Sequence, residues 1–325
     1  MKERKIAVDN KDKAPGFREL NESFDRIRPH LVRTPIMNSE EIDAMFGGHL
    51  FFKCENLQRT GSFKARGALN ACLRLIETGG VEAVATHSSG NHGKALAWAA
   101  RRSGLDCYVA VPEGAPPIKR EAIVRMGAEV IDCGPGQFDR ERALEGILER
   151  TGAHFVPPFE YADVIAGQAS CAREVLEDLP KVETILCPVG GGGLAAGSAL
   201  SIEHFGNGQK LILCEPEQAQ DAFQSMKNGR RTPHDGKPNT IADGLRTNIG
   251  QLNFDILKDF GAEVQTCSEE NILQAMRLIW DHVRIICEPS SAVPLAVLLE
   301  NPELAQNQKI CLIVSGGNVR SDFWK

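Results

Sequence analysis

Short apolar segments alternate with segments of helical periodicity along almost the whole chain of 325 residues. This alternation predicts an α/β protein in which a largely parallel sheet is covered by helices. The expected strands are residues 83–86, 107–111, 129–131, 184–189, 211–214, 263–266 and 310–314. The expected helices include residues 93–102, 119–126, 166–176, 194–204 and 269–283. Most of these strands end in a glycine-rich or polar loop, which is where such sheets bind their ligands.

Two expected helices begin with side chains that suit a cap. Asn38 stands three residues before Glu41, as in a capping box, and Ser268 precedes the helix expected at residues 269–283. Residues 227–240 are rich in glycine, proline, asparagine and basic residues, and we expect a surface loop there.

Charge and composition exclude several classes of protein. The net charge is −6 at pH 7 and the isoelectric point is about 5.8, so the chain lacks the basic excess expected of a protein that binds nucleic acid. No apolar stretch reaches the roughly 20 residues of a membrane-spanning helix, and residues 1–16 are charged without an apolar signal core. We therefore expect a cytoplasmic protein with no membrane partner. The ten cysteines are scattered without a Cys-x-x-Cys pair, which predicts reduced core residues.

Lys64 lies between a turn of hydroxyl and glycine residues and the start of an expected helix, shortly after the apolar run at residues 50–52. A lysine held among apolar neighbours has a lowered pKa, and its neutral amine can condense with a carbonyl group as a Schiff base. The alternative is a surface lysine at the start of an ordinary helix.

Four consecutive glycines, residues 190–193, follow a buried strand and precede an alanine-rich helix. Their N–H groups and the positive end of the helix dipole favour a bound phosphate. Gly190, Gly192 and Ala195 also satisfy the Gly-x-Gly-x-x-Ala pattern, and Glu215 ends the next strand where a ribose-binding carboxylate would lie. An NAD-dependent oxidoreductase therefore remains an alternative, as does a loop whose glycines serve helix packing alone.

Two further loops follow expected strands. Residues 88–93 combine two hydroxyls, an amide and exposed N–H groups at a helix start, which suits a carboxylate, although such a segment also caps helices in many proteins. Ser315 begins a Ser-Gly-Gly-Asn segment after the last strand, where its hydroxyl would meet a heteroaromatic nitrogen. Together with Lys64 and the glycine loop, these features describe a site for pyridoxal 5′-phosphate.

In this combination the chain resembles the fold-type II pyridoxal-phosphate enzymes, whose fold is that of the tryptophan synthase β subunit. More specifically, it is similar to the serine/threonine dehydratases and serine racemases. The resemblance runs from residue 34 to residue 319, and four motifs carry it in order: Gly-Ser-Phe-Lys-Ala-Arg-Gly-Ala, Ser-Ser-Gly-Asn-His-Gly, Pro-Val-Gly-Gly-Gly-Gly and Ser-Gly-Gly-Asn-Val. It implies two parallel-sheet lobes with flanking helices and a homodimer. The large cofactor-binding lobe would comprise residues 1–77 and 161–325, and a small mobile lobe, residues 78–160, would close over the substrate.

The resemblance also implies roles for individual residues. Lys64 would form the Schiff base, Asn91 would bind the phenolic oxygen of the cofactor, and Ser315 would face its pyridine nitrogen. The residues implied to bind the cofactor are Phe63, Lys64, Asn91, Gly190, Gly191, Gly192, Gly193, Leu194, Gly244, Glu288 and Ser315. The residues implied to bind the amino-acid substrate are Ser88, Ser89, Gly90, Asn91, His92 and Arg140.

The implied reaction is β-elimination from a 3-hydroxy amino acid to a 2-keto acid and ammonia, with serine, threonine and 3-hydroxyaspartate as candidate substrates. Lys64 would take the Cα proton. Ser89 matches the serine that acts as acid or base in the racemases, so racemisation is the alternative, and a non-catalytic sensor is a third. Arg140 would read a second substrate carboxylate or remain a solvated surface residue. Residues 156–159 are less polar here than in serine racemases, which favours a dehydratase.

A divalent cation is the last ligand that the resemblance implies. Its ligands would be the carboxylates of Glu215 and Asp221 and the backbone carbonyl of Ala219, and oxygen ligands of this kind suit Mg²⁺ or Ca²⁺. The alternative is a pair of carboxylates that only caps the following helix.

Overall fold

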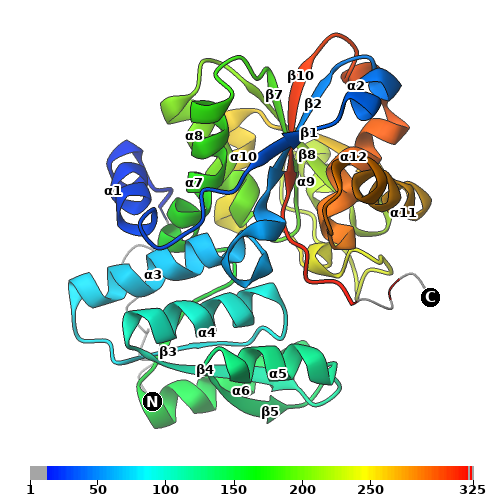
Figure 1. Cartoon of the computed structure of the whole chain (residues 1–325). Helices are drawn as coiled ribbons and strands as arrows, with labels where there is room; N and C mark the ends of the chain where they lie inside the picture. Colours follow the sequence, from blue (N-terminus) through cyan, green and yellow to red (C-terminus); the bar gives the residue numbers. More distant parts are fainter. Residues whose placement is uncertain (1–12, 321–322, 324–325) are drawn as a thin grey trace.

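The computed structural model describes residues 13–320 and residue 323. Two sheets dominate this part of the chain, each flanked by helices, and the predicted α/β class is confirmed (Figure 1). All seven predicted strands are present, as strands β3 to β5 and β7 to β10. The outer ends of the predicted large lobe, residues 1–12, 321–322 and 324–325, lie outside the described residues, and the predicted division into lobes stays a prediction.

The larger sheet has six strands in the order β1-β2-β10-β7-β8-β9, all parallel except β1. Its strands are β1 Ile36–Asn38, β2 His49–Cys54, β10 Lys309–Val314, β7 Thr184–Pro188, β8 Lys210–Pro216 and β9 Glu263–Cys267. Nearly every residue of β7, β8 and β10 is buried. Strands covered on both faces read as continuous apolar runs, which is why the sequence revealed them.

Two groups of helices cover the larger sheet, one on each face (Figure 1). On one face lie α7 Ala162–Asp178, α8 Gly193–Phe205 and α10 Gln251–Phe260. On the other lie α2 Glu40–Phe46, α11 Glu269–Leu278 and α12 Pro289–Glu300. The two remaining helices of this half are α1 Phe17–Ile27 and α9 Asp221–Asn228.

The smaller sheet has four parallel strands in the order β5-β4-β3-β6. Its strands are β5 Glu129–Cys133, β4 Asp106–Pro112, β3 Ala83–Thr86 and β6 His154–Phe155. The helices around it are α3 Lys64–Thr78, α4 Asn91–Ser103, α5 Pro117–Arg125 and α6 Gln137–Thr151. The buried face of α3 shares one core with α4, β3 and β4, so the helix that begins with Lys64 belongs to the packing of both halves of the molecule.

A buried network of charges holds the first turn of α3. Arg66 is 1% exposed and donates all five of its N–H groups, to Glu55, Glu174 and Ser170. Glu174 also accepts a 2.6 Å hydrogen bond from the buried Lys53 ammonium. Two cations and two carboxylates balance in charge, and they join β2, α3 and α7 two residues from Lys64. This network is one reason why α3 starts where it does.

The structure corrects one local prediction and confirms three others. The cap of α2 is Ser39, whose Oγ accepts from the Ile42 N–H at 3.4 Å; the predicted cap, Asn38, instead pairs with Phe51 in the sheet. The helix expected at residues 269–283 is present over that range, as α11 Glu269–Leu278 followed by a π-helix at Ile279–Val283. Ser268 caps it as predicted, and all ten cysteines are buried and free. No helix of the described residues is long and apolar enough to cross a membrane.

Candidate active site

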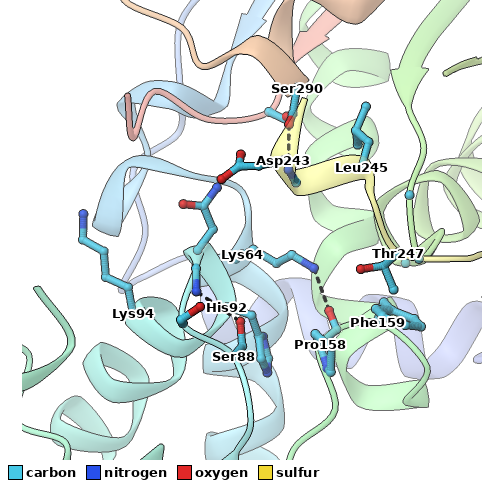
Figure 2. A pocket seen from close by; sticks show the side chains of 18 of the residues that line it. Lys64, Ser88, His92, Lys94, Pro158, Phe159, Asp243, Leu245, Thr247 and Ser290 are labelled. Carbon is cyan, nitrogen blue, oxygen red and sulfur yellow. Dashed lines mark hydrogen bonds between the residues drawn. The ribbon is translucent and has the colours of Figure 1, made fainter. Parts of the chain in front are cut away.

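Three neighbouring strands of the larger sheet bring the predicted motifs together. In the order β2-β10-β7, the chain after β2 leads to Lys64, β10 ends before Ser315, and β7 ends before residues 190–193. Because adjacent parallel strands end on the same edge of a sheet, these three segments converge there. Residues 88–92, at the end of β3 in the smaller sheet, complete the walls of one cavity of about 1020 Å³ (Figure 2).

Lys64 is half-buried and borders this cavity. Its ammonium donates a 2.7 Å hydrogen bond to the Pro158 carbonyl (Figure 2) and lies 5.0 Å from the centre of the Phe63 ring. Burial lowers the pKa of Lys64 from 10.5 to about 8. A substantial fraction of the amine is therefore neutral near physiological pH, as a nucleophile or a general base requires.

The glycine loop runs along the cavity before α8. In the described structure the N–H groups of residues 190–193 donate no hydrogen bond to the protein, so they are available to an anion at the helix N-terminus. A Cβ on Gly191 would lie 2.3 Å from the Phe159 ring, and Gly192 has φ +89° with Asn253 behind it. A side chain at Gly191 would push against Phe159, and one at Gly192 would push against Asn253. The loop therefore lines the cavity with backbone alone.

Ser315 directly follows β10, the strand that lies between β2 and β7 in the sheet. It is 5% exposed, and its Oγ is 2.9 Å from the Oγ of Ser291 at the start of α12. The Ser291 hydroxyl also accepts from the Gly316 N–H at 2.7 Å and lies 2.8 Å from the Gly316 carbonyl. This arrangement presents the neutral hydroxyl of Ser315 to the cavity.

The N-terminus of α4 points its first turn into the cavity (Figure 2). The N-cap is Gly90, and no side chain caps this helix, so Ser89 is not a side-chain cap. His92 is 2% exposed, and its Nε2 lies 3.0 Å from the Val156 carbonyl. Burial and the nearby Lys64 lower the pKa of His92 to about 3, so this imidazole stays neutral at working pH.

Asn91 belongs to a polar network that crosses from α4 to the larger sheet. Its Nδ2 donates to Glu288 at 2.7 Å, and its Oδ1 accepts from Asn318 at 2.8 Å. The backbone N–H of Asn318 donates to the same Glu288 carboxylate at 3.1 Å, and Lys94 donates to the Asn318 Oδ1 at 2.9 Å. Burial, with a smaller contribution from Asp243, raises the pKa of Glu288 to about 7.

Arg140 and His87 line the cavity on the side of the smaller sheet. Arg140 lies in the first turn of α6, where its Nε donates to the Gly136 carbonyl at 3.3 Å. The His87 ring stacks on Phe155 with centroids 5.7 Å apart. Burial, and secondarily the charge of Arg140, lowers the pKa of His87. The Arg140 guanidinium and the His87 imidazole therefore lie at the same part of the cavity wall.

Glu215 and Asp221 do not line the cavity. Glu215 caps α9, accepting from the N–H groups of Ala222 at 3.1 Å and Phe223 at 2.8 Å. Its position excludes the ribose contact that an NAD-dependent enzyme would need. Burial and repulsion from Asp221 raise the pKa of Glu215, and burial raises that of Asp221 to about 6.

The buried pair fits a cation, because Asp221 is 2% exposed and its Oδ1 has no hydrogen-bond partner among the described residues. No group of three or more His, Cys, Asp or Glu side chains in that part of the chain is arranged to hold a metal. A cation would thus depend on these two carboxylates, the Ala219 carbonyl and water. The metal site stays a prediction.

The cavity brings together all the residues predicted to bind cofactor or substrate, and none of the predicted cation ligands. Sequence reasoning missed several residues of its surroundings, namely His87, Lys94, Asn253, Ser290 and Ser291. Lys94 and His87 adjoin the predicted loop and could have been found by proximity. Asn253 lies on a different helix outside every motif, and no local pattern marks it.

Fold and cavity together match a class of enzymes in which a phosphorylated carbonyl compound is the cofactor. The chain belongs to the pyridoxal-phosphate-dependent enzymes: the family described as "Pyridoxal-phosphate dependent enzyme" matches residues 27–316. Within it, the chain belongs to the group of serine racemases, threonine deaminases and hydroxyaspartate dehydratases.

Relatives with different names are about equally similar. The β-hydroxyaspartate dehydratase of Paracoccus denitrificans (strain Pd 1222) is 41% identical over 308 residues, covering 95% of this chain and 98% of the relative. The serine racemase of Dictyostelium discoideum is 41% identical over 306 residues, covering 93% and 94%. The structure of maize serine racemase has a TM-score of 0.92 at 36% identity, covering 96% of each chain. Similarity alone therefore leaves the reaction open between elimination and racemisation.

Proposed function

We propose that this protein catalyses pyridoxal-phosphate-dependent β-elimination from a 3-hydroxy amino acid, which releases a 2-keto acid and ammonia. The observation that carries the proposal is the position of Lys64: its amine, with a pKa of about 8, borders the cavity that the glycine loop and Ser315 also line. These residues fit the cofactor, because free N–H groups suit its phosphate and a neutral amine suits its aldehyde.

When bound, pyridoxal phosphate supplies an electron sink for the negative charge that develops at the substrate Cα. Lys64 then acts as the base that accepts the Cα proton. The β-hydroxyl takes up a proton and leaves as water, the enamine that this elimination leaves tautomerises to an imine, and hydrolysis of the imine gives the keto acid and ammonia. A neutral hydroxyl such as that of Ser315 would not keep a proton on the cofactor ring as a carboxylate would, and this favours prompt loss of the leaving group over transamination.

The N-terminus of α4 is the proposed site of the substrate carboxylate. Ser88 and Ser89 line the cavity there, and the exposed N–H groups of the first turn carry the positive end of the helix dipole. Neutral His92 adds a polar contact without a charge. A carboxylate bound at this point fixes the substrate Cα between α4 and Lys64.

Arg140 and His87 support 3-hydroxyaspartate as a substrate, beside serine and threonine. A guanidinium binds a carboxylate through two parallel hydrogen bonds, and Arg140 is half-buried at the cavity wall. The relative from Paracoccus denitrificans is named for hydroxyaspartate. By contrast, Pro157, Pro158 and Phe159 form an apolar wall, which gives serine fewer polar contacts.

Racemisation is the second candidate, and Ser89 favours it. This hydroxyl lines the cavity and does not cap α4, so it is available as an acid or base. The substitution Ser89→Ala separates the two reactions. A variant that still eliminates but makes no D-amino acid would assign Ser89 to racemisation, and a wild-type enzyme that makes no D-amino acid would exclude it.

The test of the proposal is keto-acid and ammonia release from L-serine, L-threonine and the diastereomers of 3-hydroxyaspartate. Arg140→Gln is compared with Arg142→Gln, a change of an exposed arginine on the same helix outside the cavity. We expect turnover in the wild type and an Arg140→Gln loss confined to 3-hydroxyaspartate. An equal loss of turnover on serine would mean that Arg140 does not bind a second carboxylate. Absence of keto acid with all of these substrates would overturn β-elimination.

A further inference from the structure

A buried amide outside the cavity holds the glycine loop from behind. Asn253, in the first turn of α10, is 0% exposed and is not among the residues that line the cavity. Its Nδ2 donates to the Gly191 carbonyl at 2.6 Å and to the Phe159 carbonyl at 3.3 Å. Its Oδ1 has no hydrogen-bond partner among the described residues. Both interactions of this side chain therefore depend on its donor group.

The hydrogen bond to Gly191 determines which way a peptide group faces. The Gly191 carbonyl accepts from Asn253 and, at 3.2 Å, from the Gly250 N–H. A trans peptide is planar, with its C=O and N–H pointing in opposite directions, and the described chain has no cis peptide bond. With the carbonyl held toward α10, the Gly192 N–H must point to the other side, where Gly192 lines the cavity.

The second hydrogen bond of Asn253, to the Phe159 carbonyl, links this side chain to the segment that contacts Lys64. Phe159 follows Pro158, whose carbonyl accepts the Lys64 ammonium, and the Phe159 ring packs against Gly191. One amide thus joins the anion-binding loop to the segment that holds the reactive amine. A rotation of the Gly191 peptide would remove an N–H group from the anion site and loosen this wall.

We propose that Asn253 is a positioning residue, which orients the Gly191–Gly192 peptide so that its N–H binds the cofactor phosphate. The proposal rests on the proposed function, in which residues 190–193 bind that phosphate. Asn253 itself touches neither the phosphate nor the substrate. Its contribution is to pre-orient a donor before the anion arrives, which spares the cost of ordering the loop on binding.

The test is the binding of pyridoxal 5′-phosphate and of pyridoxal to the apoprotein. The variant Asn253→Asp keeps the shape of the side chain but replaces the donor with an acceptor, which repels both carbonyls. We expect the Kd for pyridoxal phosphate to rise at least about tenfold and the Kd for pyridoxal to rise clearly less, because both compounds use Lys64 but only the phosphate uses the loop. Inorganic phosphate should lose its protection of the apoprotein against heating in parallel.

A matched control changes a buried amide elsewhere. Asn70 is 1% exposed and donates to the Asp163 carbonyl at 2.7 Å, away from the cavity. The Asn70 Oδ1 also accepts from Arg26 at 2.8 Å, so Asn70→Asp removes the buried donor while its carboxylate keeps that partner, and we expect an unchanged ratio of the two affinities. If Asn253→Asp does not fold, Asn253→Thr and Asn253→Ala take its place, and the threonine, which keeps a hydroxyl donor, should bind pyridoxal phosphate more tightly than the alanine.

Different failures have different meanings. Equal weakening of pyridoxal and pyridoxal phosphate in Asn253→Asp, or equal affinities of the threonine and alanine variants, would overturn the positioning role and leave the proposed function intact. A wild-type apoprotein that bound the two compounds equally would instead overturn the phosphate site, and the role of Asn253 with it.

Discussion

Lys64 shows how much of the chemistry depends on the surroundings of one side chain. Its amine has no ion-pair partner among the residues that the structure describes, and burial lowers its pKa to about 8. The sequence predicted this lysine because it follows an apolar strand and begins a helix. Asn253 could not be predicted in the same way, because its importance comes from a contact between α10 and the loop before α8 that only the folded chain creates.

The rate of covalent attachment of pyridoxal phosphate should follow the titration of Lys64. Attachment requires the neutral amine, so below pH 8 the rate should rise about tenfold per pH unit, and above about pH 8 it should level off. An ordinary lysine would continue to gain reactivity up to about pH 10.4. Borohydride trapping of the apoprotein at short times measures the rate, with Lys64→Ala as the blank. A rate that still climbs steeply above pH 9 would contradict the lowered pKa.

At the scale of elements, the position of Lys64 depends on how α3 is anchored. The first turn of α3 carries Lys64 and Arg66 but no acidic residue, so the helix dipole and the cations repel each other. The carboxylates of Glu55 and Glu174 offset this repulsion from neighbouring elements. The sequence predicted the strands and most helices from their apolar periods, but these charges lie far apart in the chain and their pairing could not be foreseen.

Loss of the Arg66 guanidinium should destabilise the protein strongly. Arg66→Met leaves two buried carboxylates with too few partners, and we expect the free energy of unfolding to fall by about 3–5 kcal/mol. Arg74, on the same helix, forms an exposed pair with Glu77 at 3.5 Å, so Arg74→Met should cost less than about 1 kcal/mol. Urea denaturation of both variants measures the difference. Equal effects would mean that the buried network does not anchor α3.

The glycine loop should tolerate no side chain at Gly191. In Gly191→Ala the new Cβ would lie 2.3 Å from the Phe159 ring, and we expect about 1–3 kcal/mol of strain together with weaker cofactor binding. Adding Phe159→Ala should recover part of the loss, because the clash disappears. Gly146→Ala, in the middle of α6 with open space around it, should be neutral or stabilising. Thermal melts and cofactor titration compare the two variants. A Gly191→Ala variant with the same stability and cofactor affinity as Gly146→Ala would contradict the predicted clash.

In the whole molecule, the cavity depends on contacts between the two halves. Asn91 and Lys94 on α4 bind Glu288 and Asn318 across it, and Lys119 of α5 forms a 2.7 Å ion pair with Asp243. The motif order predicted which loops would meet, since ends of parallel strands share an edge. It did not predict these bridging pairs, because none of them follows a local pattern.

The predicted cation site lies apart from the cavity and should act on stability. Mg²⁺ or Ca²⁺ bound by the folded protein alone would raise its melting temperature, and a chelator would lower it again. Asp221→Asn should remove this response, since it takes away the charge of a carboxylate whose Oδ1 accepts no hydrogen bond among the described residues and lies 3.9 Å from the His234 ring nitrogen. The comparison uses apoprotein, so that cofactor binding does not contribute. A wild-type melting temperature unchanged by cation and by chelator would show that Glu215 and Asp221 serve only to bind backbone N–H groups, those of α9 and of Ile249.

The account depends most directly on Lys64 as the point of covalent attachment. Borohydride treatment of the purified protein with pyridoxal phosphate, followed by proteolysis and mass spectrometry, locates the fixed cofactor. We predict one modified peptide, with the added mass on Lys64 and none in Lys64→Ala. A modification on another lysine, or a protein that binds no cofactor covalently, would contradict the account.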